Sequence, residues 1–216
     1  MLDVGDMPLG ANCWQADGSP IITQHIASLL AKEVRLLSLG GDHAVTFPIV
    51  QAFAAKYPKL TILHLDAHPD LYDELDNNPV SHACPFARIM EAGLARRLVQ
   101  VGIRTLNDHQ KGQAKRFGVE MIEMRAWQPG TLLNLEGPLY LSLDLDALDP
   151  AFAPGVSHHE PGGFSTREVI QIIQEIEVPL VGADIVELNP MRDPLGVTTA
   201  VAAKLLKEIV SKLLTS

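Results

Sequence analysis

The sequence predicts an α/β fold, a three-layer α/β/α arrangement with a mostly parallel sheet. Three observations lead to this prediction. Short apolar runs recur along the 216 residues, and stretches of helical period follow them. The runs are continuously apolar rather than alternating, which is typical of parallel strands buried on both faces. Several runs are followed by loops rich in Asp, His, Gly and Pro, at the strand ends where open α/β sheets bind ligands.

The apolar runs are the expected strands of the sheet. They are Val34–Leu39, Leu60–Asp66, Arg97–Ile103, Val119–Glu123, Leu139–Asp144 and Leu180–Ile185. Strands that alternate with helices build a layered α/β domain. The whole chain, residues 1–216, is therefore expected to form a single domain, without an internal repeat or a linker.

The stretches of helical period are the expected helices. Ser165 and Glu168 have the spacing of a capping box at a helix start. Pro48 lies beside the apolar start of another helix, where proline is tolerated. The expected helices are Phe47–Lys56, Pro85–Glu91, Ser165–Glu177 and Thr199–Leu214.

Composition and charge exclude several classes of protein. Hydrophobic residues make up 47% of the chain, too many for a disordered protein. The 26 acidic and 17 basic side chains leave a net charge of −9, which argues against binding to nucleic acid or to an anionic membrane. No apolar stretch approaches the roughly 20 residues of a bilayer span, and the N-terminus lacks a signal-peptide pattern. Because Cys13 and Cys84 are too few for a disulfide framework or a cysteine zinc site, a soluble, cytoplasmic protein is expected.

Two expected strands end in acidic and histidine side chains. Asp66, His68 and Asp70 occupy every second position at the end of one strand, and Asp144 and Asp146 do so at the end of another. In an extended chain, side chains at alternate positions point to one side. Two strand ends are therefore expected to present five potential metal ligands at one edge of the sheet.

A sixth potential ligand, His43, follows a third strand through a glycine turn, Gly40-Gly41-Asp42-His43. Four carboxylates at one edge repel one another and raise one another's pKa values unless cations neutralise them, and two dications balance their charge. Carboxylates and imidazoles without a thiolate favour Mn²⁺. Two metal ions ~3.5–4 Å apart can lower the pKa of a shared water to give a hydroxide nucleophile. The sequence thus predicts metal-assisted hydrolysis with two Mn²⁺ ions.

The Asp-rich loops also have three other interpretations. A single Asp-rich loop can simply bond the backbone of a turn. A calcium-binding EF-hand loop does not fit, because the run Asp144–Asp149 lacks the glycine and the flanking helices of that motif. Calcineurin-like metallophosphoesterases also use an Asp-x-His strand end and a Gly-Asn-His type motif, but in the opposite order along the chain. A metallophosphoesterase is the third and weakest hypothesis.

The order and spacing of these motifs resemble the ureohydrolases, the arginase and agmatinase family. The resemblance runs from about Asp3 to the C-terminus, and Ser81-His82-Ala83 and the run Phe86–Glu91 make it most similar to plant-type arginases and their bacterial relatives. The motifs that carry it are Gly40–His43, Asp66–Asp70, Ser142–Pro150, Ala153–Gly155, Glu160–Gly163 and Gly182–Pro190.

The resemblance implies a set of metal ligands. One metal ion would be held by His43, Asp66, Asp70 and Asp144, and the other by Asp66, His68, Asp144 and Asp146, so that Asp66 and Asp144 bridge the two. It also implies that a hydroxide shared by the metals attacks a guanidinium carbon to give urea and an amine.

The resemblance further implies catalytic roles for Asp70, His82 and Glu187. Asp70 would orient the hydroxide, His82 would help to protonate the departing amine, and Glu187 would pair with the substrate guanidinium. The small-molecule substrate would be agmatine or arginine. The acidic loop Leu71–Val80 suits a cationic amine and slightly favours agmatine, whereas the similarity to plant-type arginases favours arginine. Another guanidino compound is a further alternative.

Other histidines carry weaker expectations. His158 could contact substrate, but an exposed loop position is an equal alternative, and the same holds for His159. His64 is not distinguished from a core histidine.

Family members usually carry further residues before the start of this chain, including a first strand of the sheet. The chain is therefore expected to lack that strand. Either the protein is a shortened form, or a neighbouring subunit in a homo-oligomer covers the open edge. A non-enzymatic alternative follows, in which a shortened, metal-binding relative serves as a subunit.

Overall fold

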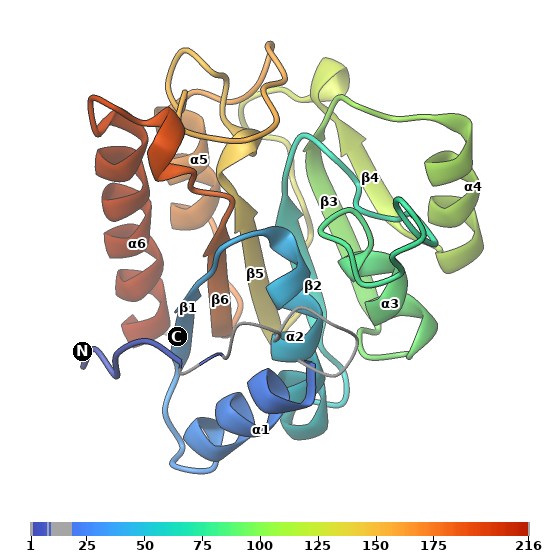
Figure 1. Ribbon diagram of the computed structural model, residues 1–216, viewed down its shortest axis with the longest axis vertical. Helices are drawn as coiled ribbons and strands as arrows, with labels where there is room; N and C mark the ends of the chain where they lie inside the picture. Colours follow the sequence, from blue (N-terminus) through green and yellow to red (C-terminus); the bar gives the residue numbers. More distant parts are fainter. Residues whose placement is uncertain (1, 8, 10–18, 216) are drawn as a thin grey trace.

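The computed structural model describes residues 2–7, 9 and 19–215 of the chain. Six strands form one sheet in the order β1-β6-β5-β2-β3-β4, and every neighbouring pair is parallel (Figure 1). The strands are β1 (Leu36–Leu39), β2 (Thr61–Leu65), β3 (Arg97–Ile103), β4 (Glu120–Glu123), β5 (Leu139–Asp144) and β6 (Leu180–Val186). The expected parallel α/β sheet is confirmed.

Helices cover both faces of this sheet. They are α1 (Ser19–Leu30), α2 (Thr46–Lys56), α3 (Pro85–Glu91), α4 (Asp108–Phe117), α5 (Thr166–Gln174) and α6 (Val197–Thr215). Helices α5 and α6 pack into a hydrophobic core on one face, and α1, α2 and α3 into a second core on the other. Gly182 of β6 allows this close packing, because a Cβ atom there would lie 2.3 Å from the ring of Phe53 in α2.

The observed bounds follow the sequence expectations closely where burial decides them. Strands β3 and β5 and helix α3 have the expected bounds, and Ser165 and Glu168 form the expected capping box at the start of α5. Two helices, α1 and α4, were not expected. Helix α4 is polar along most of its length, and it is defined instead by its ends, where Asn107 accepts a hydrogen bond from Gln110 N and Gly118 adopts a left-handed backbone.

Strand β1 lies at an edge of the sheet and pairs with β6. Within the described residues no strand precedes β1. Cys84 is a buried free thiol, while Cys13 lies outside the described residues. Among the described helices, none combines the length and the apolar character needed to span a bilayer.

Candidate metal centre

The carboxyl ends of β1, β6, β5 and β2 lie next to one another in the sheet. His43 follows β1, Glu187 follows β6, Asp144 ends β5 and Asp66 follows β2. All four side chains are buried. Parallel strand order therefore brings residues far apart in the sequence to one edge, which faces upward in Figure 1.

Both acidic strand ends form the same local turn. Asp66 Oδ1 accepts a hydrogen bond from His68 N at 2.6 Å, and Asp144 Oδ1 accepts one from Asp146 N at 2.7 Å. The chain is thus not extended here, as the alternation argument had assumed: Leu145–Ala147 forms a 3-10 turn, and Asp70 has a φ of 51°. The short Asp side chain favours a turn by bonding the backbone two residues ahead. The expected groups do come together, but the turns place them.

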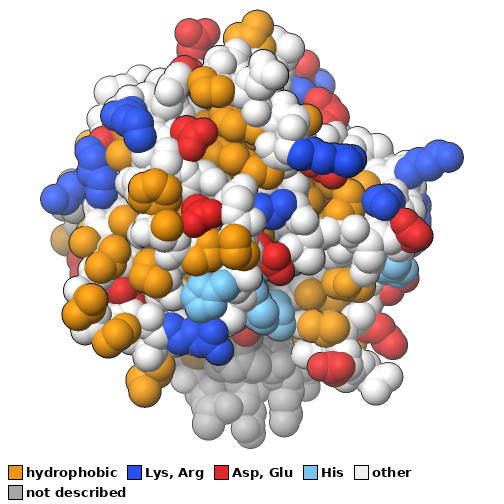
Figure 2. Space-filling view, turned by 90° about the horizontal axis from the view of Figure 1, so that it is seen from above, with side chains coloured by type: hydrophobic (Ala, Val, Ile, Leu, Met, Phe, Trp, Pro, Cys, Tyr) orange, Lys and Arg blue, Asp and Glu red, His pale blue; other side chains and the backbone are white. Residues whose placement is uncertain are grey.

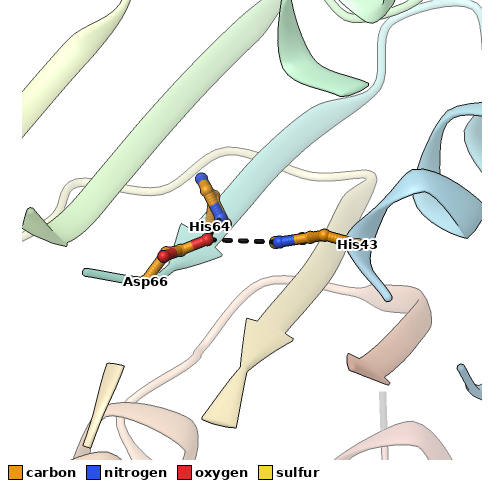
Figure 3. A group of neighbouring side chains, drawn as sticks. All are labelled: His43, His64 and Asp66. Atoms are coloured by element: carbon orange, nitrogen blue, oxygen red, sulfur yellow. Dashed lines mark hydrogen bonds and ion pairs between the residues drawn. The ribbon is translucent and has the colours of Figure 1, made fainter. Parts of the chain in front are cut away.

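His43 points its Nδ1 atom into a group of three carboxylates. This atom lies 3.2 Å from Asp66 Oδ2, 3.1 Å from Asp70 Oδ2 and 3.1 Å from Asp144 Oδ2 (Figure 3 shows the contact with Asp66). Burial lowers the pKa of His43, but the nearby carboxylates of Asp144, Asp66 and Asp70 outweigh it and hold the pKa well above its usual value. A cation between these groups would balance the three carboxylates.

The other ring nitrogen of His43 is bonded away from the carboxylates. Its Nε2 atom lies 3.0 Å from Ser142 Oγ, and Ser142 donates its own proton to Asp184 Oδ1 at 2.7 Å. Asp184 is fully buried and also accepts from Tyr140 and Thr46. Because the Ser142 hydroxyl donates its hydrogen bond to Asp184, its oxygen accepts from Nε2–H of His43, and the Nδ1 lone pair is free for a ligand.

His43 Nδ1 is a buried atom without a hydrogen bond of good geometry in the described chain. An unsatisfied buried nitrogen among carboxylate oxygens is costly unless an ion occupies the space between them. This observation fits a metal ion at this position.

A second group of side chains lies beside the first. His68 Nδ1 is 3.0 Å from Asp146 Oδ2 and 3.4 Å from Asp66 Oδ1, and the ligand atoms of the three side chains lie within 4.8 Å of one another. Burial lowers the pKa of His68, but Asp146 and Asp66 raise it to about 12. Burial and the charge of Asp66 raise the pKa of Asp146 to about 7. Two neighbouring groups that share Asp66 can each hold a cation.

His64 is the residue that the sequence analysis undervalued. It is fully buried, and its Nε2 atom lies 2.7 Å from Asp66 Oδ2 (Figure 3). The Gln100 amide nitrogen donates to Pro69 O at 2.6 Å and approaches His64 Nδ1 at 3.0 Å. Since Gln100 donates to Nδ1, Nε2 carries the proton and donates to Asp66. His64 therefore orients the carboxylate of Asp66, an expected metal ligand, in the way that residues behind metal ligands do.

Glu187 enters the site from an unusual backbone conformation. Its φ is 67°, a left-handed value that a residue with a long side chain rarely adopts. Its N–H donates to Gly41 O at 2.8 Å, and its Oε1 accepts from the backbone N–H of His43 at 2.9 Å. Burial raises the pKa of Glu187. The carboxylate is thus fixed beside His43, and its second oxygen, Oε2, makes none of the described hydrogen bonds.

His82 lies at the solvent side of the site, on the loop before α3. It is half-buried. Its ring stacks on His158, with ring centroids 5.2 Å apart and 17° between the planes. Figure 2, which looks onto this end of the molecule, shows histidine side chains gathered at the surface. The expected catalytic residues Asp70, His82 and Glu187 therefore lie around the expected metal ligands.

One carboxylate of the acidic loop Leu71–Val80, that of Asp73, contacts helix α4. Asp73 accepts a hydrogen bond from Gln113 of α4 at 2.6 Å and lies 3.6 Å from His109 Nε2. The carboxylate of Asp73 therefore already has partners on α4.

Comparisons with known proteins agree with this geometry. The family model described as the arginase family matches residues 1–211. A mitochondrial arginase 1 of Arabidopsis thaliana is 48% identical over 99% of this chain and 66% of its own length. An agmatinase of Bacillus anthracis is 35% identical over 96% of this chain and 73% of its own length. The solved structure of an arginase from Medicago truncatula superposes with a TM-score of 0.83 at 45% identity, over 90% of this chain and 64% of that one.

Proposed function

Because the chain belongs to the arginase family, we propose that it is a hydrolase that splits a guanidino group into urea and an amine. The observation that carries the proposal is His43 Nδ1, which lies unbonded among three carboxylate oxygens at the sheet edge. The chain spans about two thirds of the length of the plant arginase relatives, so the activity is stated for this chain as a proposal.

The proposed cofactor is a pair of Mn²⁺ ions. His43, Asp66, Asp70 and Asp144 would hold one, and Asp66, His68, Asp144 and Asp146 would hold the other. Bound metal ions lower the pKa of water and supply hydroxide near neutral pH. The chain's own residues do the rest: Glu187 binds the substrate guanidinium, Asp70 orients the nucleophile, and His82 delivers a proton to the departing amine.

Arginine is the proposed substrate, and agmatine is the second candidate. The sequence alone slightly favoured agmatine because of the acidic loop, yet Asp73 of that loop is engaged by Gln113 and His109. The higher identity to plant arginases, 48% against 35% for a bacterial agmatinase, also supports arginine. The two substrates differ by one carboxylate, and a site that binds this group strongly rejects a substrate without it.

The decisive experiment is urea release from arginine and from agmatine, measured side by side after incubation with Mn²⁺. The larger kcat/KM identifies the substrate.

The variant Glu187→Gln keeps the hydrogen bond from His43 N but loses the negative charge, so KM for the guanidino substrate should rise. Two bound metals without urea from any guanidino compound would favour the non-enzymatic alternative, a metal-binding subunit.

His82→Ala is expected to lower kcat by about 10²-fold, the usual contribution of a positioned general acid, while Mn²⁺ content stays unchanged. His82 is half-buried and makes no close contact with a metal ligand other than through His158, so its removal should leave the ligands in place. Metal content is measured by elemental analysis and kcat by urea release. His25→Ala on α1, at the opposite end of the sheet, is the matched control. An unchanged kcat would contradict the proposed role of His82.

Two further proposals concern the assembly and the location of the protein. Strand β1 leaves one edge of the sheet without a partner among the described residues, and we propose that a homo-oligomer protects it. The cytoplasmic location stays a prediction, since the plant relatives are named mitochondrial.

A further inference from the structure

His82 is weakly held by hydrogen bonds for a residue that must deliver a proton. Its one hydrogen bond within the described chain is to Ser81 Oγ, at 3.4 Å from Nδ1, which is longer than most bonds of this kind. Proton transfer requires the imidazole to lie within about 3 Å of its partner in a defined orientation. Another contact must therefore restrict this ring.

His158 makes that contact. The two rings stack 5.2 Å apart and 17° from parallel, while His158 also meets the edge of His68 at 6.0 Å and 79°. His158 thus bridges His82 and an expected metal ligand. Stacked aromatic rings in this distance range contribute attraction beyond the burial of their area.

The loop that carries His158 is clamped on both sides. On one side, Asn189 donates to Ser157 Oγ at 3.0 Å and to Gly155 O at 2.8 Å. On the other side, Arg104 donates to Glu160 O at 2.8 and 2.6 Å. The backbone on both sides of His158 is therefore anchored, although its side chain is exposed to solvent.

Arg104 also contacts the backbone of Asp146, an expected metal ligand. The same guanidinium of Arg104 donates to Asp146 O at 2.6 Å. Arg104 therefore links the backbone of the His158 loop to the turn that carries Asp146. Because this backbone is anchored, the His158 ring can restrict the orientation of the His82 ring that stacks on it.

We propose that His158 is a positioning residue, which holds the imidazole of His82 by ring stacking in the orientation needed for proton delivery. The inference rests on the role of His82 in the proposed function. The proposed role needs the aromatic ring of His158 for stacking and not its proton. Phenylalanine at this position should therefore preserve the function, whereas alanine should not.

The test compares His158→Ala with His158→Phe in the Mn²⁺-loaded protein. For alanine we expect kcat for urea release to fall about tenfold with KM within twofold, because a misplaced catalytic group slows the chemical step. Phenylalanine should restore kcat to within twofold of the wild type. His25→Ala on α1, which removes a histidine at the opposite end of the sheet, should leave kcat within twofold. Equal losses in the alanine and phenylalanine variants would overturn the proposal.

Crystal structures of the same Mn²⁺-loaded proteins provide a readout that does not depend on activity. In His158→Ala the His82 ring should occupy more than one rotamer, and in His158→Phe it should occupy one, as in the wild type. A single, unchanged rotamer in the alanine variant would overturn the inference even if the enzyme is active. Wild-type protein without urea release would instead contradict the proposed function, and the rotamers of His82 would still test the stacking.

Discussion

Asp144→Asn and Asp144→Ala are both expected to abolish the binding of Mn²⁺ and the release of urea. Asp144 lies 3.1 Å from His43 Nδ1, and we propose that it bridges the two metal ions. A metal ion supplies several kcal/mol of transition-state stabilisation, and each 1.36 kcal/mol is about a tenfold change in rate. Urea release should therefore fall by at least about 10³-fold in both variants.

The two substitutions separate metal binding from folding. The Asp144 side chain accepts a hydrogen bond from Asp146 N, which asparagine can keep and alanine cannot. Burial and the charges of Asp146 and Asp66 raise the pKa of Asp144, so a neutral side chain there removes repulsion in the metal-free protein. The metal-free Asp144→Asn protein should thus unfold at a temperature no lower than the wild type.

Elemental analysis and thermal melts with and without Mn²⁺ check these expectations. Asp108→Ala is the control, because the side chain of Asp108 is 98% exposed on α4. Full Mn²⁺ content or full activity in Asp144→Asn would rule out the two-metal centre. A large loss of stability in metal-free Asp144→Asn would instead show that the carboxylate serves the fold.

The strand ends that carry the expected metal ligands could be predicted because buried parallel strands appear in the sequence as continuous apolar runs. The run Leu139–Asp144 is apolar up to its last residue, so both the strand and the position of Asp144 at its end could be predicted. The same holds for Asp66 after β2. In a parallel sheet, these ends must meet at one edge.

The turns beyond the strand ends were not predictable by alternation. Asp66 and Asp144 each bond the backbone two residues ahead, and Asp70 takes a positive φ. These conformations depend on local hydrogen bonds and not on side-chain period. The alternation of side chains thus explains the position of the expected ligands only as far as the end of each strand.

The residues behind the ligands were also missed. His64 and Asp184 are polar residues inside apolar strands, and nothing local shows that Gln100 approaches His64 or that Asp184 accepts a hydrogen bond from Ser142. These two contacts join neighbouring strands, where His64 is in register with Gln100 and Ser142 with Asp184, so the register of the sheet decides them. An available signal was the type of residue: a fully buried polar side chain needs a partner, and here the partners lead to the metal ligands.

Removal of the metal ions is expected to destabilise the protein, and more strongly at pH 8 than at pH 6. At 100 times the dissociation constant, one bound ion contributes about 2.7 kcal/mol to the free energy of unfolding. About 2–4 °C of melting temperature corresponds to each kcal/mol in a chain of this size. Two sites should thus raise the melting temperature by about 10 °C or more above that in chelator.

The pH dependence follows from the directions of the pKa shifts in the metal-free protein. His43 and His68 have raised pKa values, so the stability they contribute is present below about pH 6.5 and is lost as the pH rises toward their folded values. Asp146, with its pKa raised to about 7, destabilises the fold increasingly between its unfolded value near 4 and pH 7. Asp66 has a lowered pKa, and its contribution is lost only in more acidic solution. Between pH 6 and 8 the metal-free protein should therefore become less stable.

The metal-bound protein should follow the opposite trend. Imidazole and carboxylate ligands bind metal only when deprotonated, so binding releases protons and tightens as the pH rises. The difference in melting temperature between Mn²⁺ and chelator should consequently widen from pH 6 to pH 8, and it should vanish at both pH values in Asp144→Asn. A difference that is constant or that narrows with rising pH would show that His43, His68 and Asp146 are not the groups that exchange protons for metal.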